Sequence, residues 1–90
     1  MDKNAPAKYK ILATMLEEYD KDAGDFGTVT PERCGIGKGA YAWSLRMLKA
    51  NELITGPEWG KHEPNMDGVM ITKTGIKAAV FWRDAEVIAR

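Results

Sequence analysis

Residues 30–49 (TPERCGIGKGAYAWSLRMLK) constrain the fold most, because they predict two helices joined by a tight turn. Thr30 followed by Pro31 is typical of a helix N-cap and a first helical residue. Gly35 and Gly37 interrupt this helix soon after it begins, since glycine disfavours a helix interior and accommodates turns. A longer helix is predicted over residues 39–51, with apolar side chains at helical spacing on one face: Tyr41, Ala42, Leu45 and Leu48.

The segments on either side predict the remaining elements. Apolar residues at helical spacing indicate a first helix over residues 7–19: Tyr9, Leu12, Met15, Leu16 and Tyr19. Short apolar runs at residues 53–55 and 69–72 predict two antiparallel strands, joined by a loop over residues 56–68 that is rich in glycine and proline. Residues 28–29 are a candidate third strand. A last helix is predicted from Lys73 to the C-terminus, capped by Thr72 or Thr74.

Composition limits the possible functions. Ninety residues allow one domain, which we expect to span residues 1–90. Thirteen basic residues balance thirteen acidic ones, which excludes a histone-like binder whose affinity comes from net charge, and also an acidic tail protein. One cysteine and one histidine exclude a disulfide scaffold and a zinc finger. We therefore expect no metal site.

The sequence also indicates where the protein acts. The longest apolar run, residues 78–82, is too short to span a bilayer. The first residues, MDKNAPAKYK, lack the apolar core of a signal peptide. We therefore expect a cytoplasmic protein that does not associate with a membrane.

Signals of enzymatic activity are weak. The stretch GIGKG at residues 35–39 lacks the spacing of a phosphate-binding P-loop and the serine or threonine that follows it. Cys34 and His62 could form a nucleophile and a base, but no feature of the sequence places them together. We expect no enzymatic activity and no cofactor.

The predicted order of helix, short helix, helix, two- or three-stranded ribbon and C-terminal helix is that of an α+β winged helix-turn-helix. Three stretches carry this resemblance: TPERCGIGKGAYAWSLRMLK, LKANELITG and VMITKTGIKA. In length and layout the chain resembles the small YjcQ-like family of bacteria and prophages. That family usually has glycine where this chain has Glu52, so we expect Asn51 to end the helix in a left-handed conformation instead.

The resemblance implies a transcriptional regulator that binds double-stranded DNA, with the helix at residues 39–51 in the major groove. Between residues 28 and 54 there are four basic and two acidic residues, a net charge of +2, which suits phosphate contact. We expect bases or phosphates to be contacted by Lys38, Ser44 and Arg46. We expect the DNA backbone to be contacted by Arg33, Lys49 and Lys61.

An alternative is a winged helix that binds, and could inhibit, a host protein. Trp43 and Met47 are predicted to point outward from the same helix, where they would read bases poorly but suit a protein contact. Trp59 and Trp82 would extend this interface. For Trp59 a second interpretation is favoured, in which its side chain anchors the loop onto the body.

The last helix is apolar on two sides. One stripe contains Ile76, Ala79, Val80 and Val87, and a second contains Ala78, Phe81, Trp82, Ala85, Ile88 and Ala89. A helix apolar on both faces needs two surfaces to pack against. A symmetric homodimer would cover the second stripe, and the alternative is a monomer in which the first helix and the wing cover both.

Overall fold

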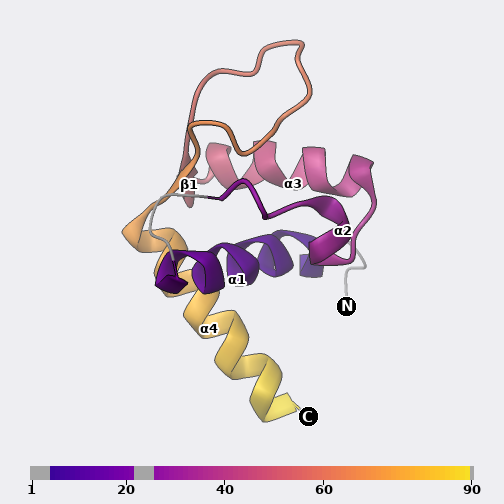
Figure 1. Cartoon of the computed structure of the whole chain (residues 1–90). Coiled ribbons are helices and arrows are strands. Elements are labelled where there is room, and N and C mark those ends of the chain that lie inside the picture. The colour runs from indigo at the N-terminus through magenta and orange to yellow at the C-terminus, as the bar shows by residue number, and fades with distance from the viewer. Residues whose placement is uncertain (1–4, 22–25, 90) are drawn as a thin grey trace.

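The computed structural model describes residues 5–21 and 26–89 and has an α+β fold (Figure 1). Along the chain its elements are α1 (Ala5–Lys21), α2 (Pro31–Cys34), α3 (Lys38–Ala50), β1 (Ile54–Thr55), β2 (Met70–Ile71) and α4 (Lys73–Ala89). The strands form one two-stranded antiparallel sheet. This order is compatible with a winged helix. None of the helices in the described ranges is long and apolar enough to cross a membrane.

The corner between α2 and α3 forms as the sequence predicts. Thr30 caps α2, because its side-chain oxygen accepts a hydrogen bond from the Arg33 amide at 3.2 Å. Gly35 then adopts a left-handed conformation (φ 71°) that ends the helix after a single turn.

The residues before α2, residues 28–29, do not form the candidate third strand, so that prediction is wrong. They form a turn in which Val29 N donates to Phe26 O at 3.0 Å, and Val29 O accepts from the Tyr41 hydroxyl at 2.6 Å. Burial raises the pKa of Tyr41 to about 12.

The end of α3 differs from the prediction by one residue. Asn51 keeps a negative φ of −91°, and its side-chain amide donates to Met47 O at 2.9 Å. Glu52 takes the left-handed conformation instead, with φ 61°. The amides of Glu52 and Leu53 donate to Lys49 O at 3.0 Å and Leu48 O at 2.9 Å. This is the Schellman arrangement, which leaves the last α3 carbonyls satisfied.

The ribbon joins α4 through a tight contact. Ile54 pairs with Ile71 and Thr55 with Met70. Thr72, one of the two predicted caps, accepts from Gly75 N at 3.0 Å, and its hydroxyl also lies 2.8 Å from Glu52 O. A Cβ atom on Gly75 would lie only 2.0 Å from Leu53 O. The first turn of α4 therefore packs directly against the backbone of Leu53, in the segment between α3 and β1.

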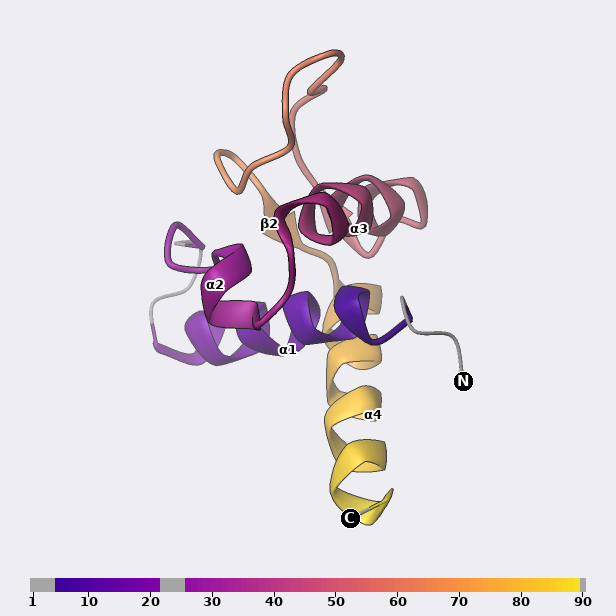
Figure 2. The same ribbon diagram turned by 90° about the vertical axis from the view of Figure 1, so that its right-hand side faces the viewer.

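The core lies where α1 packs against α3 and α4. Figures 1 and 2 show α3 and α1 as two layers, with the ribbon at one end and α4 crossing α1 and then extending away from the body. Fully buried side chains come from each helix except the short α2, among them Leu12, Met15, Leu45, Leu48 and Ala79. The apolar faces predicted for α1 and α3 are thus the buried ones.

The body covers the described part of the first apolar stripe predicted on α4 and a part of the second. Ala79 is buried, and Trp82 stacks on Tyr9 of α1 with ring centroids 4.7 Å apart. Trp82 and Ala78 belong to the second stripe, and Ala78 also packs against the core, whereas Phe81 is 77% exposed, so the second stripe is only partly covered. The side chains of Val87, Ile88 and Ala89 lie outside the described residues.

Candidate nucleic-acid interface

The outward face of α3 is the candidate interface. Its core-facing residues are buried as predicted, and Trp43, on the opposite side, is 46% exposed. Arg46 is exposed, whereas Met47 is half-buried. The helix carries Lys38, Arg46 and Lys49 and no acidic residue. It therefore presents positive charge to solvent without a carboxylate of its own.

Ser44 does not belong to this face, so its predicted contact with DNA is wrong. Its exposure is 0%, because it follows Tyr41 by three residues and precedes Leu48 by four, which places it on the buried side of α3. Its hydroxyl has no hydrogen-bond partner among the described residues. DNA could reach it only if the core opened.

Arg46 reaches across to the loop at residues 56–68, here called the wing loop. Its Nη2 atom donates to Gly60 O at 3.1 Å and to His62 O at 3.0 Å. No described residue contacts its Nε and Nη1 hydrogens. Arg46 therefore holds the loop through Nη2 and keeps hydrogen-bond donors at Nε and at Nη1 for a ligand.

Lys49 makes a second contact with the wing loop, one helical turn from Arg46. Its Nζ donates to Pro57 O at 2.7 Å and lies 3.0 Å from a Glu58 carboxylate oxygen. It also lies 5.1 Å from the centre of the Trp59 ring, within cation–π range. The wing loop thus occupies the Lys49 ammonium group, which makes Lys49 a poor candidate for the predicted contact with the DNA backbone.

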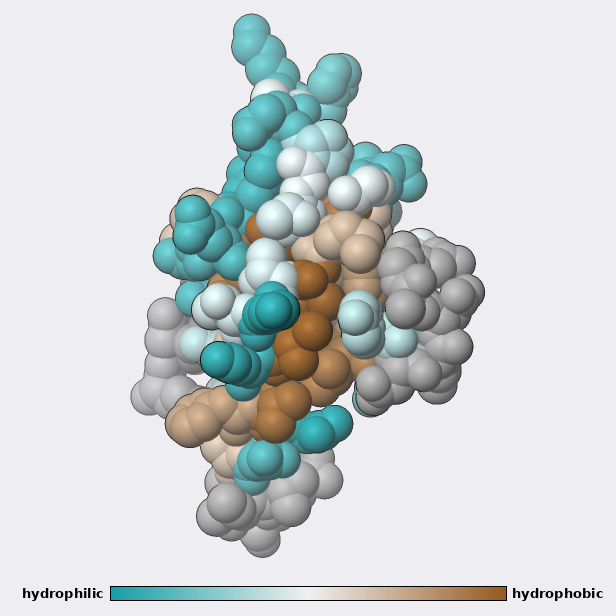
Figure 3. Space-filling model, turned by 90° about the vertical axis from the view of Figure 1, so that its left-hand side faces the viewer, coloured by the Kyte–Doolittle hydropathy of each residue, from teal (hydrophilic) through white to brown (hydrophobic). Residues whose placement is uncertain are grey.

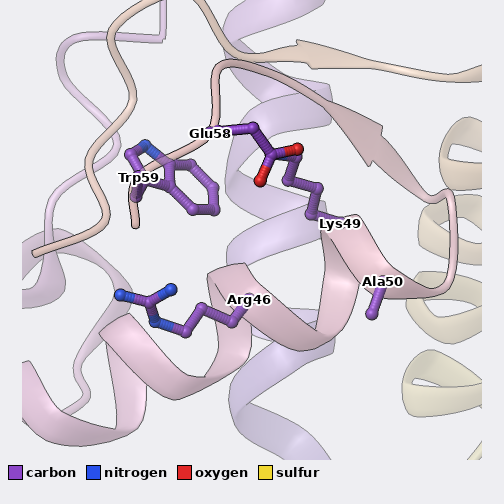
Figure 4. Close-up of a pocket in the computed structure, with 5 residues that line it drawn as sticks. All are labelled: Arg46, Lys49, Ala50, Glu58 and Trp59. Carbon is purple, nitrogen blue, oxygen red and sulfur yellow. The ribbon is translucent and has the colours of Figure 1, made fainter. Parts of the chain in front are cut away.

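Trp59 anchors the wing loop onto the body, as the favoured interpretation of the sequence predicts. Its side chain is only 6% exposed, so its alternative assignment to an exposed protein interface is wrong. Figure 4 shows Arg46 and Lys49 extending from α3, with Trp59 and Glu58 of the wing loop facing them. Together with Ala50 and Glu58 these residues line a groove of about 340 Å³.

Arg33 lies away from this groove, in the contact between α1 and α2. Its guanidinium pairs with Glu18, lies 3.4 Å from Glu17 and donates to Thr28 Oγ1 at 3.0 Å. The hydrogen bond with Glu18 is the main cause that raises the Arg33 pKa. Two carboxylates already compensate this cation, so it is a poor partner for phosphate.

Lys38 and Lys61 are exposed, and no described residue pairs with either of them. Lys38 begins α3, and Lys61 lies in the wing loop. Among the predicted DNA contacts in the described ranges, three cations thus keep hydrogen-bond donors available: Lys38, Arg46 and Lys61.

The remaining aromatic candidate, Trp82, does not join the α3 face. Trp82 is half-buried on α4, where it stacks on Tyr9. Trp43 and Met47 are therefore the two members of the predicted protein interface that remain together.

Cys34 and His62, the possible nucleophile and base, lie in different environments. Cys34 is buried and its thiol donates to Thr14 at 3.7 Å, whereas His62 is exposed in the wing loop. Burial raises the pKa of Cys34. Within the described ranges no group of three metal-ligating side chains occurs.

Sequence reasoning missed the contacts between α3 and the wing loop. The only signal for them is the spacing of Arg46 and Lys49, which places both cations on one side of α3. Comparison of the chain with models of known families, with curated proteins and with solved structures found no match. The resemblance to the YjcQ-like family therefore remains a prediction.

Proposed function

We propose that the chain is a winged helix-turn-helix protein that binds double-stranded DNA through α3 and the wing loop, most simply as a transcriptional regulator of bacterial or prophage origin. The observation that carries this proposal is the charge of α3. The helix contains three cations and no acidic residue of its own, and its outward face is open to solvent. A helix of this kind beside an antiparallel ribbon suits docking in a major groove.

Three side chains would make the contacts. Lys38 would meet phosphate at the start of α3, and Lys61 would do so from the wing loop. Arg46 would donate from Nε or from Nη1 to a base edge or a phosphate, while Nη2 keeps the loop in place. The bond to the loop therefore orients Arg46 for the ligand.

The charge balance predicts moderate, salt-sensitive affinity. The wing loop itself contains Lys61 against Glu58, Glu63 and Asp67, so the attraction comes chiefly from α3. Three phosphate contacts give a salt slope of about −2.7, so raising salt from about 50 mM to about 200 mM should weaken binding about 40-fold.

Fluorescence anisotropy of a mixed-sequence duplex at these two salt concentrations tests the proposal. Lys38→Ala should weaken binding and reduce the slope by about 1, and Arg46→Ala should cost roughly 1–3 kcal/mol. Lys10→Ala, which removes an exposed cation on α1, is the matched control and should change neither. Absence of binding at the lower salt, or equal losses for all three variants, would refute the proposal.

A second function is favoured by one observation, the exposure of Trp43 at the centre of the α3 face. An exposed tryptophan beside Met47 suits a hydrophobic contact with a host protein. In that case Trp43→Ala should abolish the complex and leave the circular dichroism spectrum unchanged. Lys38→Ala, by contrast, should have little effect on a protein complex that this aromatic side chain dominates.

Helix-turn-helix proteins commonly bind DNA as two-fold dimers, with half-sites one helical turn apart. We therefore also propose that the chain forms a homodimer through α4, because this helix carries the most exposed of the large hydrophobic residues described, Phe81.

A further inference from the structure

The free face of α4 carries an ordered pattern of side chains. Gly75 and Ala79 face the body, and the exposed residues Lys77, Phe81 and Asp84 follow one another along the opposite face. Their spacing of four and three residues aligns them along one side of a helix. Figures 1 and 2 show that this part of α4 extends beyond the other elements, so the face is open.

The surroundings of Phe81 would permit another helix to approach closely. Ala78 and Ala85 are near it on the helix surface, and their side chains are small. Hydrophobic side chains continue over one face of the molecule from below the wing loop toward the described end of α4 (Figure 3). A partner helix could thus bury the Phe81 ring without displacing a bulky neighbour.

From this pattern we infer that α4 pairs with α4 of a second copy in an antiparallel, two-fold arrangement centred on Phe81. Lys77 precedes Phe81 by four residues, and Asp84 follows it by three. A two-fold axis at Phe81 brings Lys77 opposite the partner's Asp84, and Asp84 opposite the partner's Lys77. The face is therefore complementary in charge to itself.

The charges also select the direction of pairing. Parallel helices would set Lys77 against the partner's Lys77 and Asp84 against the partner's Asp84, and like charges in contact repel. Among the described residues, the cation that pairs with Asp84 is Arg83 of the same helix, at the long distance of 3.9 Å. Its carboxylate can therefore turn to the partner's lysine.

This inference specifies the dimer of the proposed function, but it does not require DNA, so the two can fail separately. Sedimentation velocity of the full chain over a concentration series up to roughly 1 mM should show a reversible dimer. Phe81→Ser should raise the dimer dissociation constant about tenfold or more, because a central aromatic contact is lost. Trp43→Ser, which removes an exposed aromatic side chain from α3, is the matched control and should leave the dimer intact.

Charge reversal tests the direction of pairing. Lys77→Glu and Asp84→Lys should each weaken self-association, because each brings like charges together twice. An equimolar mixture of the two variants should form heterodimers, since every pair across the axis is then attractive again. The replaced side chains are all exposed, so circular dichroism should show unchanged folding.

A monomer at every concentration, or a dimer that Trp43→Ser abolishes and Phe81→Ser does not, would overturn the inference. Failure of the two charge variants to associate on mixing would overturn the antiparallel arrangement. A dimer that shows no salt-sensitive DNA binding would refute the proposed function alone. DNA binding by a chain that is monomeric throughout would refute the dimer alone.

Discussion

The strands β1 and β2 and the wing loop together form the wing. It is attached to the body at its base, where the ribbon meets α4, and at its loop, and the two attachments differ in kind. At the base, Gly75 lies so close to Leu53 that a single added carbon atom would meet the backbone. At the loop, Arg46 and Lys49 reach out from α3 to backbone carbonyl groups of the wing loop. The base is held by close packing, and the loop by two cations of α3 together with the buried Trp59 ring.

This difference shows which part of the wing can respond to a ligand. Close packing at the base leaves no alternative arrangement, because a packed interior resists even small changes in volume. A guanidinium group that binds carbonyls at the surface can also bind phosphate, because both present oxygen acceptors. We therefore expect the base to determine stability and the loop to determine binding.

The largest expected effect is at the base. Gly75→Ala should destabilise the protein by about 3 kcal/mol or more, because α4 would have to move away from Leu53 O. Urea denaturation measures this loss. Gly39→Ala is the control, since no atom lies near a Cβ at that position of α3, and alanine there should stabilise the helix by up to about 1 kcal/mol. Equal effects at the two glycines would contradict the close contact.

Thr72→Ala should cost about 1–2 kcal/mol, because the variant leaves the first turn of α4 without its cap. The same change at Thr74, the other cap that the sequence allowed, should have little effect. Thermal unfolding of both variants distinguishes the two positions. A larger loss for Thr74→Ala would show that α4 begins elsewhere.

Glu52→Gly should stabilise the protein by about 1 kcal/mol, since glycine adopts a positive φ without steric cost. Asn51→Gly should instead destabilise it, because the side-chain bond to Met47 is lost at a residue whose φ is negative. Denaturant midpoints of the two variants should therefore shift in opposite directions. Stabilisation by Asn51→Gly would place the left-handed residue one position earlier.

The smallest effect on stability is expected at the loop. Arg46→Ala should change the free energy of unfolding by no more than about 1 kcal/mol, because the lost bonds are exposed. Amide hydrogen exchange in the wing loop should nevertheless accelerate, as the loop loses contacts with α3. Lys61→Ala removes a loop cation without such contacts and should leave exchange unchanged. Unchanged exchange in both variants would mean that Lys49 and Trp59 hold the loop without Arg46.

Elements with a local cause could be predicted from the sequence. Thr30, Pro31 and Gly35 determine where α2 begins and ends through their own backbone preferences and side-chain bonds. The apolar spacing in α1 and α3 identified the buried faces. The pairing of residues 53–55 with residues 69–71 followed from two short apolar runs on either side of a loop.

Features that depend on distant partners could not be predicted in the same way. The carbonyl groups that bind Arg46 belong to a loop whose path has no local signature. The tight contact at Gly75 depends on where Leu53 lies after the turn at Glu52. Ser44 was assigned to the wrong side of α3 because its polar side chain suggested exposure, whereas the positions of Tyr41 and Leu48 require burial.

The most direct test of the central claim is an NMR titration of the chain with a mixed-sequence duplex at low salt, observing the Arg46 Nε–H group and the backbone amides. The account predicts that signals of Arg46, Lys38 and the wing loop change together, while those of Gly75 and its neighbours at the base stay fixed. Changes confined to other surfaces, or a spectrum that DNA leaves unaltered, would contradict it.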